Sequence, residues 1–243
     1  MADDFKNAQP KEYQRLFMKD NLRPDGRVTT ACRPVKINTN TVQTSYGSSL
    51  VCLGETIVIC GIKGKFAQPD IATPSSGSLV PNVSLPPLCN SKYRPGPPNS
   101  KATYISQKLA DLYQDVIDLT TLCITSGKLV WCLYADIVCL NDDGNVLDAA
   151  VAAVTASLRT LRLPGVFVDE VNDMVLVDEA KERVRVEVKY SPVASTLAGK
   201  DTRHLLSIYS TFTQHLLCIY STFTQHLLDT YVLDIYSTLV SML

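Results

Sequence analysis

The residues best suited to chemistry gather directly after the long apolar segment 128–140. Three carboxylates, Asp142, Asp143 and Asp148, lie within seven positions of one another, and Gly144 permits a tight turn between them. An Ala-rich segment with the composition of a helix follows. Such carboxylates could ligate a metal ion, or they could stabilise the turn and the N-terminus of the helix. The second role explains their spacing more simply, and we expect no bound metal.

The positions of histidine and cysteine exclude several other kinds of catalysis. All three histidines lie beyond residue 203, so the first 203 residues offer neither a Ser–His nor a Cys–His pair. The eight cysteines include no CxxC motif, and several fall in apolar strand patterns such as 58–60. The chain also begins without the apolar run of a secretory signal. We therefore expect reduced, structural thiols and no cofactor.

The charge balance argues against strong autonomous binding of nucleic acid. Lys and Arg total 23 and Asp and Glu total 24, so few counterions could be displaced from a polyanion. A local basic patch remains around a proline-rich loop, formed by Lys92, Arg94 and Lys101. It could contact RNA phosphates without reading bases, or it could be an ordinary solvated loop. In the first case we expect weak binding without sequence preference.

Hydrophobic periodicity predicts a mixed α/β (α+β) domain. Apolar residues recur at three- and four-residue steps in the helical segments and alternate in the strand segments. Segment 67–100 is rich in Pro, Ser, Gly and Asn and is interpreted as a long connection with little regular structure. Segment 128–140 is interpreted as a central strand buried on both faces, with Trp131 in the core. The expected helices are 10–22, a segment beginning at 101 and 146–161; the expected strands are 35–38, 49–53, 56–62, 128–140 and 184–190.

The C-terminal segment differs in kind from the rest. Residues 204–214 and 215–225 are an eleven-residue tandem repeat with one substitution. We divide the chain into a domain at 5–197 and a tail at 198–243, with the tail helical or disordered and outside the domain's sheet. Ser, Thr, Gln and His interrupt every apolar run before about eighteen residues, so no membrane span is expected.

Four stretches together resemble the ring subunits of the RNA exosome, in the RNase PH superfamily: residues 10–27, 47–62, 80–98 and 127–150. The resemblance runs from about residue 5 to Leu197. It implies an RNase PH-like domain with a ribosomal-protein-S5-like β-α-β-α arrangement, incomplete at the C-terminus by roughly its last quarter. The implied partners are other RNase PH-like ring subunits, cap subunits with S1 and KH domains, a hydrolytic exoribonuclease, and RNA in the shared channel. The implied location is the nucleus, including the nucleolus, and the cytoplasm.

The resemblance also provides a test of activity. Phosphorolytic relatives hold phosphate at a helix N-terminus with a Gly-Thr-Arg or Gly-Ser-Arg loop, where backbone N–H groups and a guanidinium grip the anion. The corresponding run here is Gly144, Asn145, Val146, Leu147 and Asp148. Val146 replaces the hydroxyl and Leu147 replaces the arginine, while the aspartates would repel phosphate.

Two further features of the resemblance count against catalysis. The family's catalytic aspartates belong to the part without a counterpart here, and its RNA-gripping arginine is matched only by Lys101. The sequence therefore predicts a non-catalytic, structural ring subunit. An active phosphate-dependent exoribonuclease and a non-functional truncated product are the alternatives.

Overall fold

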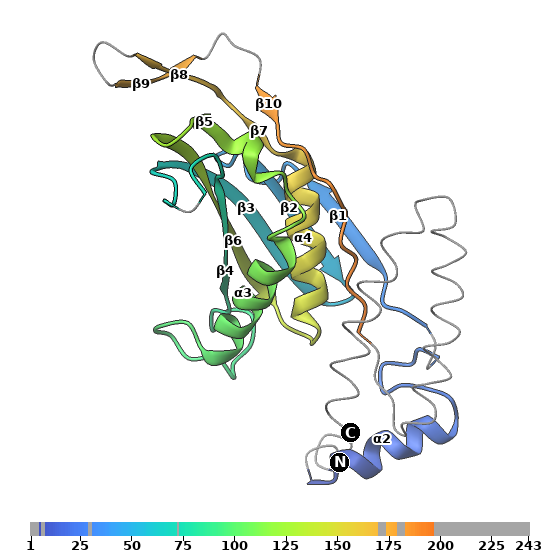
Figure 1. Ribbon diagram of the computed structural model, residues 1–243. Coiled ribbons are helices and arrows are strands. Elements are labelled where there is room, and N and C mark those ends of the chain that lie inside the picture. Colours follow the sequence, from blue (N-terminus) through green and yellow to red (C-terminus); the bar gives the residue numbers. More distant parts are fainter. Residues whose placement is uncertain are drawn as a thin grey trace. The chain divides into compact units, whose positions relative to one another are not determined.

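A computed structural model (Figure 1) describes residues 5, 8–28, 31–71, 73–169, 174–178 and 183–196. The chain divides into two compact units, Met1–Ala194 and Ser195–Leu243. The predicted tail repeat lies outside the described residues. The helices are α2 (Pro10–Lys19), α3 (Ser100–Tyr113) and α4 (Val146–Thr160), with a 3-10 turn η1 (Leu119–Leu122). The strands are β1 (Val35–Thr39), β2 (Gly47–Leu53), β3 (Thr56–Ala67), β4 (Ser78–Ser84), β5 (Cys123–Thr125), β6 (Leu129–Asn141), β7 (Arg162–Leu163), β8 (Gly165–Asp169), β9 (Met174–Asp178) and β10 (Val184–Arg185).

One six-stranded sheet organises the domain. Its strand order is β1-β2-β3-β6-β4, with β5 paired to β6 beside it. Neighbours are antiparallel except β4, which runs parallel to β6. The β2–β3 hairpin turns at Gly54, whose φ of 61° fits the type II′ turn that its sequence predicted. The predicted mixed α/β fold is confirmed.

Helices α3 and α4 cover one face of this sheet (Figure 1) and enclose the core with it. In α3 the buried positions are Ala102, Ile105, Leu109 and Tyr113, which is the three- and four-residue spacing of one helical face. The alanines of α4 let it approach the sheet closely, and its Ser157 donates to the Ser49 hydroxyl over 3.0 Å. No helix of the described part has the length and apolarity that a membrane crossing requires.

The opposite face of the sheet carries a half-buried apolar row. Leu50, Ile59 and Val138 are register neighbours on β2, β3 and β6, and each is half-buried. The prediction that 128–140 is buried on both faces is therefore wrong, because burial along β6 alternates beyond Leu133. Trp131, predicted to be core, is 6% exposed and its ring centroid lies 4.4 Å from that of Phe66.

Three other expectations need correction. Segment 67–100 contains β4, which pairs with β6 over its whole length. Pro81 lies within β4 and hides its strand pattern. Among the described residues β4 has one neighbouring strand, β6, and such an edge strand tolerates a missing N–H. Helix α3 ends at Tyr113, before the apolar positions Val116 and Leu119. The strand expected over 184–190 is shorter, with β10 at Val184–Arg185 and a single bridge between Val188 and Ile117.

The close approach of β2 and α4 gives the first testable prediction. A Cβ added to Gly47 would lie 2.5 Å from the backbone oxygen of Ser157 and 3.0 Å from Leu161 Cα. Because both obstacles are backbone, Gly47→Ala should lower the free energy of unfolding by about 1–3 kcal/mol. Urea unfolding measures this change. Gly61→Ala is the control, since its Cβ would meet Ser45 Cβ at an ordinary 3.7 Å, and equal midpoints for the two variants would contradict the packing described.

Candidate functional site

The candidate site is the loop that connects β6 to α4. Gly144 and Asn145 both have positive φ, at 90° and 58°, which turns the chain sharply before α4 begins at Val146. Asn145 occupies the N-cap position without a side-chain cap, and its Nδ2 donates to Asp148 Oδ2 over 2.6 Å. The expected turn is confirmed, but the predicted N-cap role of the aspartates is not what the geometry shows.

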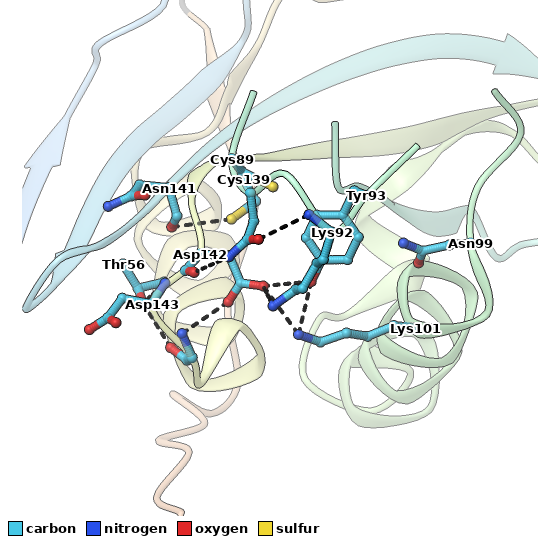
Figure 2. Close-up of polar contacts among 12 residues, drawn as sticks. Thr56, Cys89, Lys92, Tyr93, Asn99, Lys101, Cys139, Asn141, Asp142 and Asp143 are labelled. Carbon is cyan, nitrogen blue, oxygen red and sulfur yellow. Dashed lines mark hydrogen bonds and ion pairs between the residues drawn. The ribbon is translucent and has the colours of Figure 1, made fainter. Parts of the chain in front are cut away.

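Asp142 is buried at the centre of this loop, and Figure 2 shows the donors that surround it. Its side chain is 0% exposed. Oδ2 accepts from the Tyr93 hydroxyl at 2.5 Å and pairs with Lys92 Nζ at 2.8 Å and Lys101 Nζ at 3.4 Å. Oδ1 accepts from the Gly144 backbone N–H at 2.9 Å. We call Asp142 with these four donors the Asp142 cluster.

The cluster sets the protonation of its members. Burial alone raises the pKa of the Asp142 carboxyl, but the hydrogen bonds from Lys92, Tyr93 and Gly144 outweigh it and hold that pKa well below its ordinary value. The hydrogen bond to Asp142 raises the pKa of Lys92. Burial, followed by the bond to Asp142, raises the pKa of Tyr93 to about 12. At neutral pH the Asp142 carboxylate is therefore ionised, Lys92 is charged and the Tyr93 phenol keeps its proton.

A second set of contacts fixes the backbone of the same loop from the sheet side. Arg33 donates to the carbonyl oxygens of Asp143 and Gly144, at 2.9 and 3.2 Å. Thr56 Oγ1 donates to the Gly144 oxygen at 2.7 Å and accepts from the Asp143 N–H at 3.2 Å. Sequence reasoning missed Arg33 and Thr56, because partners about a hundred positions away leave no local pattern.

The predicted phosphate-loop residues fall into two groups. Val146 is 2% exposed and belongs to the core, and Leu147 packs partly against it. Gly144 and Asp148 are engaged with Arg33, Thr56 and Asn145, so both make contacts within the domain. None of the described residues forms a group of three metal-ligating side chains. Asp142 faces the lysines, whereas Asp143 is 61% exposed and lies 3.6 Å from Arg33.

The predicted RNA-binding residues are only partly brought together. Lys92 and Lys101 converge on Asp142, and both ammonium groups lie over the Tyr93 ring, at 4.9 and 5.8 Å from its centroid. Their side chains remain 51% and 45% exposed. Arg94 is exposed and is not part of the Asp142 cluster. That both lysines pair with the buried Asp142 could not be predicted from their spacing in the sequence.

Two buried thiols of the domain, one of them beside this site, are not suited to nucleophilic chemistry. Cys60 and Cys139 are buried at 0% exposure, and burial raises the pKa of each thiol to about 12. A buried thiol that keeps its proton is a poor nucleophile. These cysteines contribute to packing, as their strand positions indicated.

Comparison with known proteins identifies the family. Residues 31–164 match the RNase PH family, described as the 3′ exoribonuclease family, domain 1. This match covers more than half of the chain, which therefore belongs to the RNase PH family. The resemblance on which the sequence interpretation rested is confirmed.

Individual relatives are named as components of the exosome. The chain is 42% identical to exosome complex component rrp43 of Schizosaccharomyces pombe, over 68% of this chain and 62% of that protein. It is 32% identical to exosome complex component Rrp42 of Sulfurisphaera tokodaii, over 81% of this chain and 71% of that protein. The chain thus spans less than two thirds of the Schizosaccharomyces pombe relative.

Solved structures agree with this assignment. A chain of the Archaeoglobus fulgidus exosome with RNA bound to the active site superposes with a TM-score of 0.66 and 33% identity, covering 75% of this chain and 68% of that one. A chain of the archaeal exosome core superposes with a TM-score of 0.64 and 28% identity, covering 83% of this chain and 74% of that one. The fold is that of the exosome's RNase PH-like subunits.

The Asp142 cluster predicts a strong effect of removing one charge. Asp142→Asn should lower the free energy of unfolding by about 2–3 kcal/mol, because the amide leaves two ammonium groups without a buried counter-charge. Denaturant unfolding at pH 7 measures it. Asp143→Asn is the control, because it removes the same charge at the next position, where the side chain is 61% exposed. It should lower the free energy of unfolding by less than about 1 kcal/mol. Equal losses of stability in the two variants would show that the buried contacts of Asp142 contribute nothing beyond the removed charge.

The depressed pKa of Asp142 predicts how its contribution to stability depends on pH. The folded-state pKa of Asp142 lies below its unfolded value near 3.8, so its contribution is fully present above that pH and is lost as pH falls toward the folded-state value. The stability gap between the native chain and Asp142→Asn should therefore be constant from pH 5 to 7 and narrow below about pH 4. A gap that narrows already between pH 7 and 5 would contradict the depressed pKa.

Proposed function

We propose that this protein is a non-catalytic, structural subunit of the exosome ring, which helps to enclose the channel through which RNA passes for 3′-to-5′ processing and decay. The support is the family membership together with the names of the relatives, which are exosome components in both a eukaryote and archaea. The superposition on chains of two archaeal exosomes supports a place in the same kind of ring.

The observation that carries the non-catalytic part of the proposal is the position of Val146. In phosphorolytic relatives the loop offers a hydroxyl and a guanidinium to phosphate. Here Val146 is buried in the core and Leu147 packs beside it. The nearby guanidinium, that of Arg33, is engaged with the loop's carbonyl oxygens. A phosphate approaching the start of α4 would lack the bidentate partner that such sites use.

The partners follow from this role. We infer that the chain contacts other RNase PH-like ring subunits directly, and that cap subunits with S1 and KH domains and a hydrolytic exoribonuclease complete the assembly. RNA would be contacted in the shared channel, by a surface that includes Lys92, Arg94 and Lys101. The same reasoning assigns the protein to the nucleus, its nucleolus, and the cytoplasm.

Phosphorolysis is the direct test of catalytic inactivity. The purified chain, incubated with a short labelled RNA and inorganic phosphate, should release no nucleoside diphosphate above a mock preparation. An archaeal exosome assayed in parallel is the positive control. Phosphate-dependent release that co-elutes with the folded chain would overturn the proposal and favour an active exoribonuclease.

Ring assembly is tested separately. The chain, co-expressed with the other RNase PH-like ring subunits of its own organism, should co-purify with them in a stable complex through size exclusion. If the partners assemble with one another and leave this chain out, the structural role is wrong and a non-functional product is the better description.

A further inference from the structure

The donors around Asp142 have the composition of an oxyanion-binding site. Two ammonium groups, one phenolic hydroxyl and one backbone N–H converge on a single carboxylate at 2.5–3.4 Å. Proteins bind phosphate and carboxylate ligands with this kind of set, since charged donors and oriented backbone amides both favour an anion. In this protein the anion belongs to the chain itself.

We propose that the Asp142 cluster is an oxyanion site whose resident ligand is the Asp142 carboxylate, and that the site accepts an external phosphate group when this carboxylate is removed. The proposal does not rest on the exosome role, because it concerns the isolated chain and an inorganic ion.

The geometry explains why the native chain keeps external oxyanions out. The carboxylate is fully buried and satisfied at both oxygens, one by the Gly144 N–H and the other by Tyr93 and the lysines. It is covalently attached, so it competes at an effective concentration far above that of a dissolved ion. An external phosphate would have to displace it and leave it buried without its donors, which is costly.

The resident anion also explains the separation of the donors in the sequence. Lys92 and Tyr93 come from the loop after β4, Lys101 from the first turn of α3 and Gly144 from the turn before α4. No local motif holds these three segments together. Asp142 attracts donors from all of them, and Asn90 Nδ2 adds a bond to the Asp142 carbonyl oxygen at 3.2 Å. Removing the carboxylate leaves four converging donors with an excess of positive charge.

The experiment compares Asp142→Ala with Asp143→Ala, which change the net charge equally at adjacent positions. Each variant is titrated with sodium phosphate against sodium chloride of equal ionic strength at pH 7.5, with calorimetry and thermal unfolding as readouts. Asp142→Ala should bind phosphate at least about tenfold more tightly than the native chain and show a higher Tm in phosphate than in chloride. The native chain and Asp143→Ala should show only the small general effect of phosphate on stability.

Two further arms keep the test decisive. Asp142→Ala combined with Lys101→Met should lose the phosphate response, because one of the two ammonium donors is gone. Asp142→Ala could be unfolded in sodium chloride. In that case adding phosphate, or acetate as a replacement carboxylate, should restore the folded signal. A phosphate response of Asp142→Ala no greater than that of Asp143→Ala, or no restoration of an unfolded variant, would overturn the proposal.

Discussion

The buried, ionised carboxylate of Asp142 and its donors are the interaction on which the arrangement of the candidate site depends. A carboxylate with no exposure is stable only when charged or polar donors replace its water, and here four of them do so. Those donors belong to the loop after β4, the start of α3 and the turn before α4. Satisfying one buried charge therefore ties three segments together, and the hydrogen bond from the Asp142 N–H to the Cys89 carbonyl oxygen, at 3.1 Å, joins two of them further.

This constraint also bears on the proposed absence of phosphorolytic chemistry in this fold. The sheet and its two covering helices belong to the RNase PH family. We infer from the sequence resemblance that the loop between β6 and α4 corresponds to the place where that family's phosphorolytic members bind phosphate. In this chain every polar feature of the loop described above is engaged within the domain. Arg33 and Thr56 bind its carbonyl oxygens, Asp142 binds its Gly144 N–H, and Val146 lies in the core. The family's scaffold is kept, while these polar groups of the loop are satisfied from within the domain.

Much of the scaffold could be predicted from the sequence, because local periodicity reports on local burial. The β2–β3 hairpin with Gly54 at its turn, helix α4 and the core position of Trp131 all followed from such patterns. Strand β4 was missed because Pro81 disguises it and its pairing with β6 is parallel and non-local. The site was harder still. Lys92 and Lys101 look like exposed basic residues in sequence, and nothing in their spacing shows that they meet a carboxylate 41 positions beyond Lys101.

The protonation of Asp142 itself provides the most direct test of this account. The measurement is the ¹³C chemical shift of the Asp142 side-chain carboxyl followed by NMR from pH 7 to the acid unfolding limit, with the exposed Asp143 in the same spectra as the internal reference. The account predicts that Asp142 stays ionised throughout the folded range, below the pH at which an ordinary aspartate with a pKa near 3.8 takes up its proton. If Asp142 instead titrates at or above that value in the folded protein, its carboxylate is not held by Lys92, Tyr93 and Lys101. The claim that these donors are satisfied by a carboxylate of the chain itself would then be wrong.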